Sequence, residues 1–479
     1  MIYDVLIIGG GITGSLIARE LSRYDLKICL LEKENDVANK TTSANSAIIH
    51  SGYDPVPGTL KAKLNVLGNK KFDQLCKELC VHFERIGSLT VATNEKQLQE
   101  LVKLKERGTI NGVDVEILSK EEVNKLEPNL SKNVVGALLA ETAGIIDPFN
   151  LCVHAMENAI DNGVNLFLNS PVIDIKKDNE IYQIITPNNL FEAKIVINAA
   201  GNYADKIASM VEEIDWSITP RKGEYYLLDH FKKGFVNHVI FPLPSEKGKG
   251  VLVAPTTSGN YLVGPSSESQ LDKEDFSTDS YTLGQIKSQA NDMIDNIPYN
   301  QVIRVFAGLR PSSSRHDFII ENSKLNPRFI NVAGIESPGL ASSPAIADYV
   351  INNYVLKLIN AEKKNNFNPY VKPYHRFNHS LLENEIDFIN EHKEYGKMIC
   401  NCEKVSEGEI MDVLSRSCPP HSVKGVKRRT RAGFGKCQGG FCEPSIVLLL
   451  AKHYNISPLE VPLNDDGSYI LANKVKDGK

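Results

Sequence analysis

Apolar positions near the N-terminus follow two different periods. Residues 3–8 form a short, mostly apolar run, residues 12–24 carry apolar side chains at helical spacing, and residues 27–33 form a second apolar run. A short apolar run that ends in glycine is typical of a buried parallel strand, whereas a period of about 3.6 residues is typical of an amphipathic helix. The pattern therefore predicts a strand–helix–strand unit.

The same pattern returns at 191–210 and 329–359, where a strand leads through glycines into a helix. Between 216 and 310 the apolar runs are short and separated by Pro and Gly, as expected for an antiparallel sheet. Residues 361–395 are polar and offer little core, which predicts a linker before a separate C-terminal module. The predicted fold class is α/β: a Rossmann-like domain with an inserted antiparallel-sheet (α+β) domain and a small C-terminal module.

Composition excludes several classes of protein. The chain has 479 residues, with 54 basic and 59 acidic side chains. Its length predicts two or three domains, and its near-balanced charge provides no global field for nucleic acid or an anionic membrane. We see no apolar span of ~20 residues and no basic flank of a signal peptide. We therefore expect a cytoplasmic protein without a transmembrane segment, associated with a membrane only through a partner.

Three glycines directly after the first strand, Gly9, Gly11 and Gly14, form a G-x-G-x-x-G turn, and Glu32 closes the next strand. Such glycines let the backbone turn tightly and approach a pyrophosphate at the helix N-terminus, while the carboxylate suits a ribose diol. A glycine turn without a ligand is the alternative. Strand, turn, helix and acidic residue nevertheless occur in the order that a dinucleotide site requires, so we predict such a site.

Four of the nine cysteines form two late pairs: Cys400 with Cys402, and Cys437 with Cys442. The odd total and the clustering favour metal ligation in a reducing compartment over disulfides. Pairs at such short spacing can place their thiolates around one metal site, and glycines near the second pair would let the chain wrap closely. Zinc is the rival metal, although structural zinc sites more often use two C-x2-4-C knuckles.

Two further strand-to-glycine turns, at 196–205 and 330–347, would bring backbone close to the same ligand. Together with the first turn they resemble the FAD-dependent oxidoreductases of the D-amino-acid-oxidase-like superfamily over residues 1–355. The resemblance implies FAD as the cofactor, with its pyrophosphate at the first turn and its flavin ring beside the last. Besides the first-turn glycines and Glu32, it implies cofactor contacts at Ser43, Asn45, Ser46, Val172, Ala200, Gly201, Gly334, Gly339 and Leu340.

Residues 41–68 are similar to a segment of L-2-hydroxyglutarate dehydrogenases and, less closely, of the flavin subunits of glycerol-3-phosphate dehydrogenases. Both families oxidise a secondary alcohol next to an anionic group, which requires a base for the hydroxyl proton and a cation for the anion. His50 is the candidate base, because a neutral imidazole can take a proton near pH 7 and the motif puts it close to the flavin in relatives. Arg310 is the candidate anion clamp, because a guanidinium group binds a carboxylate or phosphate in a bidentate fork, and Tyr225 is a further candidate catalytic residue. A structural role is the alternative for each.

Other polar residues in these segments are weaker candidates. Lys61 lies in a predicted helix, where a solvated charge is the ordinary interpretation, and Arg221 and Glu224 are candidates for the rim of the cavity. Tyr225 and Tyr226 alternate on a predicted strand, so one should face the cavity and the other the core.

Two features point to different substrates. Glycerol-3-phosphate enzymes usually carry Gly-Gly-Lys in the last flavin turn, whereas this chain has Glu336 there and is more similar to the hydroxyglutarate enzymes. Residues 396–450, however, resemble the [2Fe-2S] domain of the bacterioferritin-associated-ferredoxin type, which also ends some anaerobic glycerol-3-phosphate dehydrogenase subunits. This resemblance implies a [2Fe-2S] cluster held by the four late cysteines.

A basic run, Lys427, Arg428, Arg429 and Arg431, lies between the two cysteine pairs. One short cluster on an acidic chain is weak support for nucleic-acid binding. A solvated face is the ordinary interpretation. We predict instead that the run compensates the negative charge of the cluster.

Together these inferences predict a dehydrogenase that transfers hydride from glycerol 3-phosphate to FAD and passes electrons through the cluster to a second flavoprotein or carrier subunit. L-2-hydroxyglutarate or another 2-hydroxyacid is the alternative substrate, and a non-catalytic redox relay is the alternative of another class. The predicted parts are an FAD-binding domain (1–75, 145–215 and 320–360), a substrate-binding domain (76–144 and 216–319), a linker (361–395), a [2Fe-2S] domain (396–455) and a tail (456–479).

Overall fold

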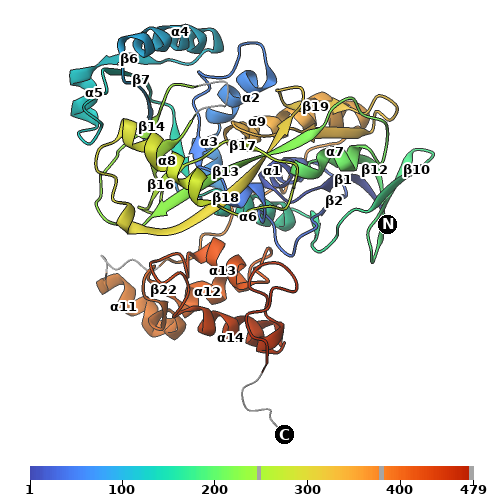
Figure 1. Ribbon diagram of the computed structural model, residues 1–479. Coiled ribbons are helices and arrows are strands. Elements are labelled where there is room, and N and C mark those ends of the chain that lie inside the picture. The colour runs from blue at the N-terminus through green and yellow to red at the C-terminus, as the bar shows by residue number, and fades with distance from the viewer. Residues whose placement is uncertain (245–249, 377–381, 474–479) are drawn as a thin grey trace.

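The computed structural model describes residues 1–244, 250–376 and 382–473. Parts of the predicted linker (377–381) and of the predicted tail (474–479) lie outside these residues. Figure 1 shows a large body and, beneath it, a smaller C-terminal module coloured orange to red. None of the helices in the described ranges is long and apolar enough to cross a membrane.

The first sheet has the predicted strand–helix–strand unit at its centre. Its strands are β1 (Ile2–Ile8), β2 (Ile28–Leu31), β9 (Asn165–Phe167), β10 (Asp174–Asp178), β11 (Ile181–Ile185), β12 (Leu190–Asn198), β19 (Ile319–Asn322) and β20 (Phe329–Ala333). β1 pairs in parallel with β2 and β12, and β20 continues in parallel beyond β12. The antiparallel pairs of this sheet, β10–β11, β11–β12 and β19–β20, lie towards its edge. The prediction of a Rossmann-like sheet is confirmed.

Alternate side chains of β1 enter two different cores. Val5 and Ile7 pack in the core that contains α1 (Ile12–Leu21), α6 (Pro148–Asp161) and α9 (Gly339–Val350). Leu6 and Ile8 enter a second core, closed by α7 (Ala204–Ala208). A strand buried on both faces needs an unbroken apolar sequence, which explains the run at the N-terminus.

The second sheet is antiparallel, as predicted, apart from one parallel pair of strands. Its strands are β5 (Ser88–Ala92), β6 (Glu116–Ser119), β7 (Gly136–Ala140), β13 (Ile218–Leu228), β14 (Val239–Phe241), β15 (Leu252–Pro255), β16 (Tyr261–Gly264), β17 (Glu268–Ser269) and β18 (Val302–Ser313). The parallel contact joins β14 to β5, and the long pair β13–β18 forms the wall nearest the first sheet. α8 (Ser280–Met293) lies where only short strands were predicted.

The remaining elements of the large body connect the two sheets. They are a small sheet of β3 (Ile48–Ile49), β4 (Phe83–Arg85) and β8 (Gly144–Ile146), and the helices α2 (Leu60–Asn69), α3 (Phe72–Glu78), α4 (Glu95–Asn111) and α5 (Lys120–Leu126). α2 packs against α9, which brings the segment after β3 next to the last glycine turn.

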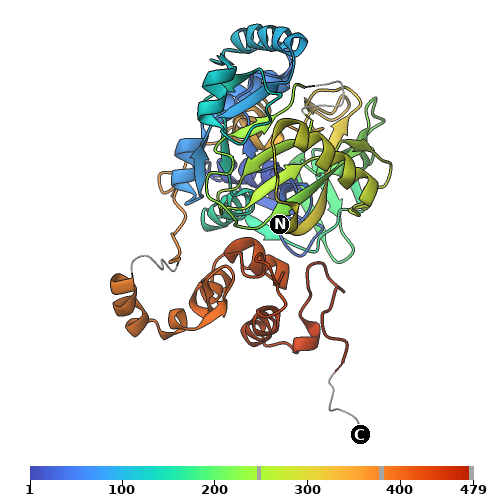
Figure 2. The same cartoon turned by 60° about the vertical axis from the view of Figure 1, so that its left-hand side comes forward.

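The C-terminal module has a core of its own. Its elements are β21 (Met398–Cys400), β22 (Val405–Ser406), α12 (Glu407–Leu414), α13 (Val423–Thr430) and α14 (Glu443–Tyr454), preceded by α11 (Leu382–Glu391). Figures 1 and 2 show this module as a separate body, with α13 on the side that faces the rest of the chain. α13 packs against α6 of the large body.

The segment predicted as a linker is partly built into the fold. Lys363 bridges to Tyr24, and the amide of Val371 donates to the carbonyl oxygen of Glu78 over 2.9 Å. Its first half therefore follows the surface of the first domain, and α11 occupies much of its second half. The exact domain boundaries stay predictions.

Candidate active site and cysteine centre

The glycine turn brings two chain segments into contact. Gly9 has a φ of +111°, and a Cβ atom there would lie 2.5 Å from the carbonyl oxygen of Ala199. A Cβ atom on Gly14 would lie 2.0 Å from the carbonyl oxygen of Gly9. Only glycine fits both positions. Glu32 accepts a hydrogen bond from the Gly10 amide over 2.6 Å, which holds the turn against the end of β2.

A cavity of about 1260 Å³ is lined by residues of both sheets. Small-molecule sites usually occupy roughly 300–1,000 Å³, so this cavity has room for a large cofactor together with a substrate. The predicted site residues that line it are Gly9, Gly11, Glu32, Asn45, Ser46, His50, Val172, Ala200, Gly201, Tyr225, Arg310, Gly339 and Leu340.

Three predicted residues are absent from the described lining of the cavity: Gly14, Ser43 and Gly334. The Ser43 hydroxyl donates to the carbonyl oxygen of Lys40 over 2.8 Å, behind the wall. Gly334 has a φ of +66°, and a Cβ atom there would lie 2.6 Å from that of Ser313. These residues shape the loops of the site, and their direct contact with a cofactor stays a prediction.

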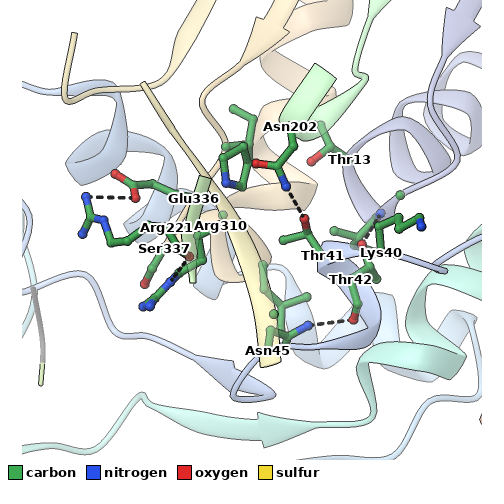
Figure 3. A pocket seen from close by; sticks show the side chains of 18 of the residues that line it. Thr13, Lys40, Thr41, Thr42, Asn45, Asn202, Arg221, Arg310, Glu336 and Ser337 are labelled. Carbon is green, nitrogen blue, oxygen red and sulfur yellow. Dashed lines mark hydrogen bonds and ion pairs between the residues drawn. The ribbon is translucent and has the colours of Figure 1, made fainter. Parts of the chain in front are cut away.

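One end of the cavity carries a cluster of charges. Lys61 Nζ lies 2.8 Å from Glu336 Oε1, and Arg221 Nη2 lies 3.3 Å from Glu336 Oε2. Arg310, opposite Arg221 in the β13–β18 pair, donates to the carbonyl oxygen of Ser266 over 2.6 Å. Figure 3 shows Arg221, Arg310 and Glu336 together, away from the threonines that line the other side. We call Lys61, Arg221, Arg310 and Glu336 the anion end, because its three cations outnumber its one carboxylate and can therefore attract an anion.

Two expectations about this region are wrong. Lys61, expected to be a solvated charge, is 15 % exposed and is paired with Glu336. Glu224, expected at the rim, is fully buried and accepts a hydrogen bond from the Asp279 amide. Arg221 does line the cavity. Lys61 lies in the segment that carries the family resemblance, but only the fold brings it to Glu336, which is 275 positions away.

The backbone of His50 is fixed by a helix. Its carbonyl oxygen accepts hydrogen bonds from the Asn65 and Asn69 side chains of α2 over 2.7 and 3.1 Å. Its ring lies beside that of Phe241, with the ring centroids 5.7 Å apart. The imidazole lines the cavity, and α2 holds its backbone in place. A group that transfers a proton must be positioned in this way.

Tyr225 and Tyr226 point to opposite faces of β13, as predicted. The Tyr225 hydroxyl lies 3.1 Å from Ser46 Oγ, and its ring stacks on Phe306 at 4.7 Å. Burial raises the pKa of Tyr225, so its hydroxyl stays protonated and can donate a hydrogen bond. Tyr226 packs edge-on against Tyr299 in the core of the second sheet.

The four late cysteines lie together as two pairs. Cys402 Sγ and Cys437 Sγ are 3.8 Å apart, and the thiols of Cys400 and Cys442 share a hydrogen bond. The chain crosses closely here, because a Cβ atom on Gly435 would lie 2.3 Å from that of Cys402. Two close pairs suit a cluster whose two irons take two protein ligands each. Within the described ranges, we find no group of three or more His, Cys, Asp or Glu side chains arranged to hold a single metal ion.

The basic run does not form a solvated face. Arg428 and Arg429 are 7 % and 2 % exposed, and both bind Asp36 of the large body, at 3.0 and 2.8 Å. Arg431 binds Glu403 at 2.8 Å. The prediction that the run as a whole compensates the cluster is therefore wrong for Arg428 and Arg429, whose counter-charge is a carboxylate in another domain.

The loop after β2 receives the C-terminal module. Besides Asp36, the Asn35 side chain donates to the carbonyl oxygen of Asn464 over 2.6 Å, and the Asn39 side chain donates to Asp465 over 3.0 Å. We call residues 35–39 the docking loop. Sequence reasoning missed it, because no local pattern links this loop to the end of the chain.

Comparisons with known proteins agree with this geometry. Residues 4–352 match the family described as "FAD dependent oxidoreductase", and residues 398–452 match the "BFD-like [2Fe-2S] binding domain". The "Glycerol 3-phosphate dehydrogenase" of Caloramator mitchellensis is 49 % identical over 477 residues, which cover 99 % of each chain. The "Glycerol 3-phosphate oxidase" of Mycoplasma genitalium is 38 % identical over 76 % of this chain and 97 % of its own.

A solved relative extends the comparison to structure. The dithionite-reduced L-alpha-glycerophosphate oxidase from Mycoplasma pneumoniae, with FAD bound, aligns with a TM-score of 0.75 at 35 % identity, over 78 % of this chain and 100 % of its own. The predicted cofactors, FAD and a [2Fe-2S] cluster, are confirmed by these matches. The residues present fit both groups: Gly9 and Gly11 of the glycine turn line one wall of the cavity, and the four thiols lie within one small module.

Proposed function

Because the chain belongs to the family of FAD-dependent oxidoreductases, we propose that it oxidises glycerol 3-phosphate to dihydroxyacetone phosphate and delivers the electrons to a second protein. When bound, FAD supplies a hydride acceptor that can release electrons singly, and the [2Fe-2S] cluster carries one electron at a time. The observation that carries the proposal is the full-length likeness to a protein named glycerol 3-phosphate dehydrogenase, cysteine module included.

The anion end supports a phosphate rather than a neutral group. Lys61, Arg221 and Arg310 carry three positive charges around Glu336, which leaves an excess of two among these four side chains. A phosphate monoester carries about two negative charges at neutral pH. Guanidinium groups bind phosphate oxygens in pairs, so Arg310 and Arg221 would orient the substrate while Lys61 adds charge.

We assign the proton transfer to His50. Oxidation of a secondary alcohol by hydride transfer requires removal of the hydroxyl proton, and a neutral imidazole is a suitable base near neutral pH. His50 lines the same cavity as the anion end and is held by α2. Tyr225, with its protonated hydroxyl beside Ser46, is assigned a hydrogen bond to the substrate.

The substrate assignment predicts a selective loss of flavin absorbance. Under anaerobic conditions, sn-glycerol 3-phosphate should bleach the flavin of the reconstituted protein, whereas L-2-hydroxyglutarate at the same concentration should not. The physical reason is that the excess charge of the anion end is concentrated at one place, which suits one phosphate group better than the two separate carboxylates of L-2-hydroxyglutarate. Bleaching by L-2-hydroxyglutarate alone would overturn the proposal. Bleaching by neither substrate would favour a redox relay that receives electrons from proteins.

Replacing Arg310 with methionine should weaken substrate binding more than it slows chemistry. Methionine keeps an unbranched stem but carries no charge, so KM for glycerol 3-phosphate should rise roughly 10- to 100-fold, the loss expected for one charge-assisted contact of ~1.5–3 kcal/mol. Steady-state kinetics with an artificial acceptor measures this. Arg315→Met is the matched control, because Arg315 is paired with Asp215 and Glu321 outside the cavity lining. An unchanged KM in the Arg310 variant would remove it from the anion end.

A further inference from the structure

Lys427 is the member of the basic run that lacks a carboxylate. It lies in α13 and is 7 % exposed, and across the part of the chain that the structure describes its ammonium has no recorded hydrogen bond or ion pair. Its Nζ lies 4.6 Å from the centroid of the Phe434 ring. A buried charge without a counter-charge is costly, because it has lost its hydration. Among the described residues, no carboxylate lies within ion-pair distance of this ammonium.

Two other cations approach Lys427. Lys424 precedes it by one turn of α13, and Arg304 comes from β18 of the large body. Burial, together with the charges of Arg304 and Lys424, lowers the pKa of Lys427 to about 8. Arg304 also has no ion pair within the described ranges, and burial lowers its pKa. Cations at a partly buried boundary between two domains repel each other, and a nearby anion offsets this repulsion.

The cysteine centre supplies that anion. Lys427 Cδ lies 3.7 Å from the place of a Cβ atom on Gly433, and the Gly433 amide donates to the sulfur of Cys400. The groups of opposite charge that face Lys427 are Glu443 and, when it is a thiolate, Cys442. One carboxylate cannot balance three cations. A cluster held by four thiolates is anionic, so it completes the charge balance at this boundary.

We propose that Lys427 is a tuning residue that raises the reduction potential of the [2Fe-2S] cluster. The proposal rests on the cluster and not on the identity of the substrate. When the cluster is reduced, one ferric ion gains one electron and becomes ferrous, and no bond is made or broken. The added negative charge is stabilised by nearby positive charge, so the reduced form gains more than the oxidised form.

The test is an anaerobic redox titration of the full-length holoprotein with dithionite, in which the reduced cluster is followed by electron paramagnetic resonance. Lys427→Gln should shift the equilibrium towards the oxidised cluster by about tenfold, which is about 59 mV to more negative potential for a one-electron couple. Lys427→Arg should keep the wild-type potential, because it keeps the charge. Lys452→Gln is the control: it removes an exposed lysine from α14 of the same module.

Iron and acid-labile sulfide are measured in every variant. A purely structural role for Lys427 would lower cluster content without moving the potential of the clusters that remain, and this result would overturn the proposal. If Lys427→Gln fails to assemble a cluster, Lys427→Met decides, because methionine keeps an apolar stem beside Phe434 and removes the charge. An unshifted potential in Lys427→Met would then refute the proposal. Substrate-dependent bleaching of the flavin is unaffected by either outcome, so failure here is distinct from failure of the substrate assignment.

Discussion

Replacing Asp36 with alanine is expected to detach the C-terminal module from the large body. Asp36 is 1 % exposed, and its two carboxylate oxygens accept hydrogen bonds from Arg428 and Arg429 over 2.8 to 3.0 Å. Without the carboxylate, two guanidinium groups remain buried between the domains without the counter-charge that Asp36 supplies. Breaking a buried ion pair by removing one partner usually costs about 3–5 kcal/mol. Small-angle X-ray scattering should therefore report a larger radius of gyration for the variant.

The same substitution should weaken retention of FAD. The docking loop supports the dinucleotide turn directly, because the Ala38 amide donates to the carbonyl oxygen of Gly10 over 3.1 Å and Val37 packs against Gly10. A docking loop that has lost its contacts with the C-terminal module should hold the dinucleotide turn less firmly. The flavin content after gel filtration measures this. We expect a lower ratio of flavin to protein than in the wild type.

The matched control is Asp73→Ala. Asp73 also binds an arginine, Arg85, at 2.6 Å, but its side chain is 62 % exposed. Exposed ion pairs contribute about 0–1 kcal/mol, so this control should keep both the radius of gyration and the flavin content. Equal behaviour of the two variants would show that the pair between Asp36 and the arginines does not hold the module in place.

Acid should act on the same contact. Burial alone would raise the pKa of Asp36, but the charges of Arg429 and Arg428 outweigh burial and hold it at about 2, below the ordinary value of 3.8. A carboxyl group whose pKa is depressed in the docked state stabilises that state above its ordinary pKa. The contribution is therefore complete above pH ~4 and is lost as the pH falls towards 2.

Sequence patterns predicted the parts of this molecule that depend on neighbours in the chain. The apolar run of β1, the glycines that follow it and the two cysteine pairs are local signals, and each has the predicted position. α8 was missed because its sequence is mostly polar: Ile286, Ala290 and Met293 are among its few buried residues, and this is too weak a helical period to recognise among short strands.

The missed features depend on contacts between distant parts of the chain. Lys61 meets Glu336 only because α2 packs against α9, and Arg429 meets Asp36 across 393 positions. Local spacing contains no signal for either pair. The basic run is an example. Its four cations are close in sequence, but in the fold Arg428 and Arg429 bind Asp36, Arg431 binds Glu403, and Lys427 lies near the cysteine centre.

Replacing His50 with alanine should slow reduction of the flavin by glycerol 3-phosphate by about 10²–10⁴-fold, the range usually lost with a general base. Substrate affinity should change little, because the anion end is intact. Anaerobic stopped-flow measurements over a range of substrate concentrations separate the limiting rate from the dissociation constant. The wild-type rate should fall on acidification, since a protonated imidazole cannot accept the hydroxyl proton, and this fall should be absent in the variant.

Two controls separate a base from a packing residue at this position. Added imidazole should restore part of the rate in His50→Ala if the missing function is proton transfer, because a small base can enter the cavity left by the side chain. His82→Ala removes a histidine whose side chain is 53 % exposed and paired with Glu84 away from the cavity, and it should keep the wild-type rate. The opposite result is that His50→Ala weakens substrate or flavin binding, keeps the acid dependence of the rate and is not restored by imidazole. His50 would then be a packing residue of the cavity, and another group would have to accept the proton.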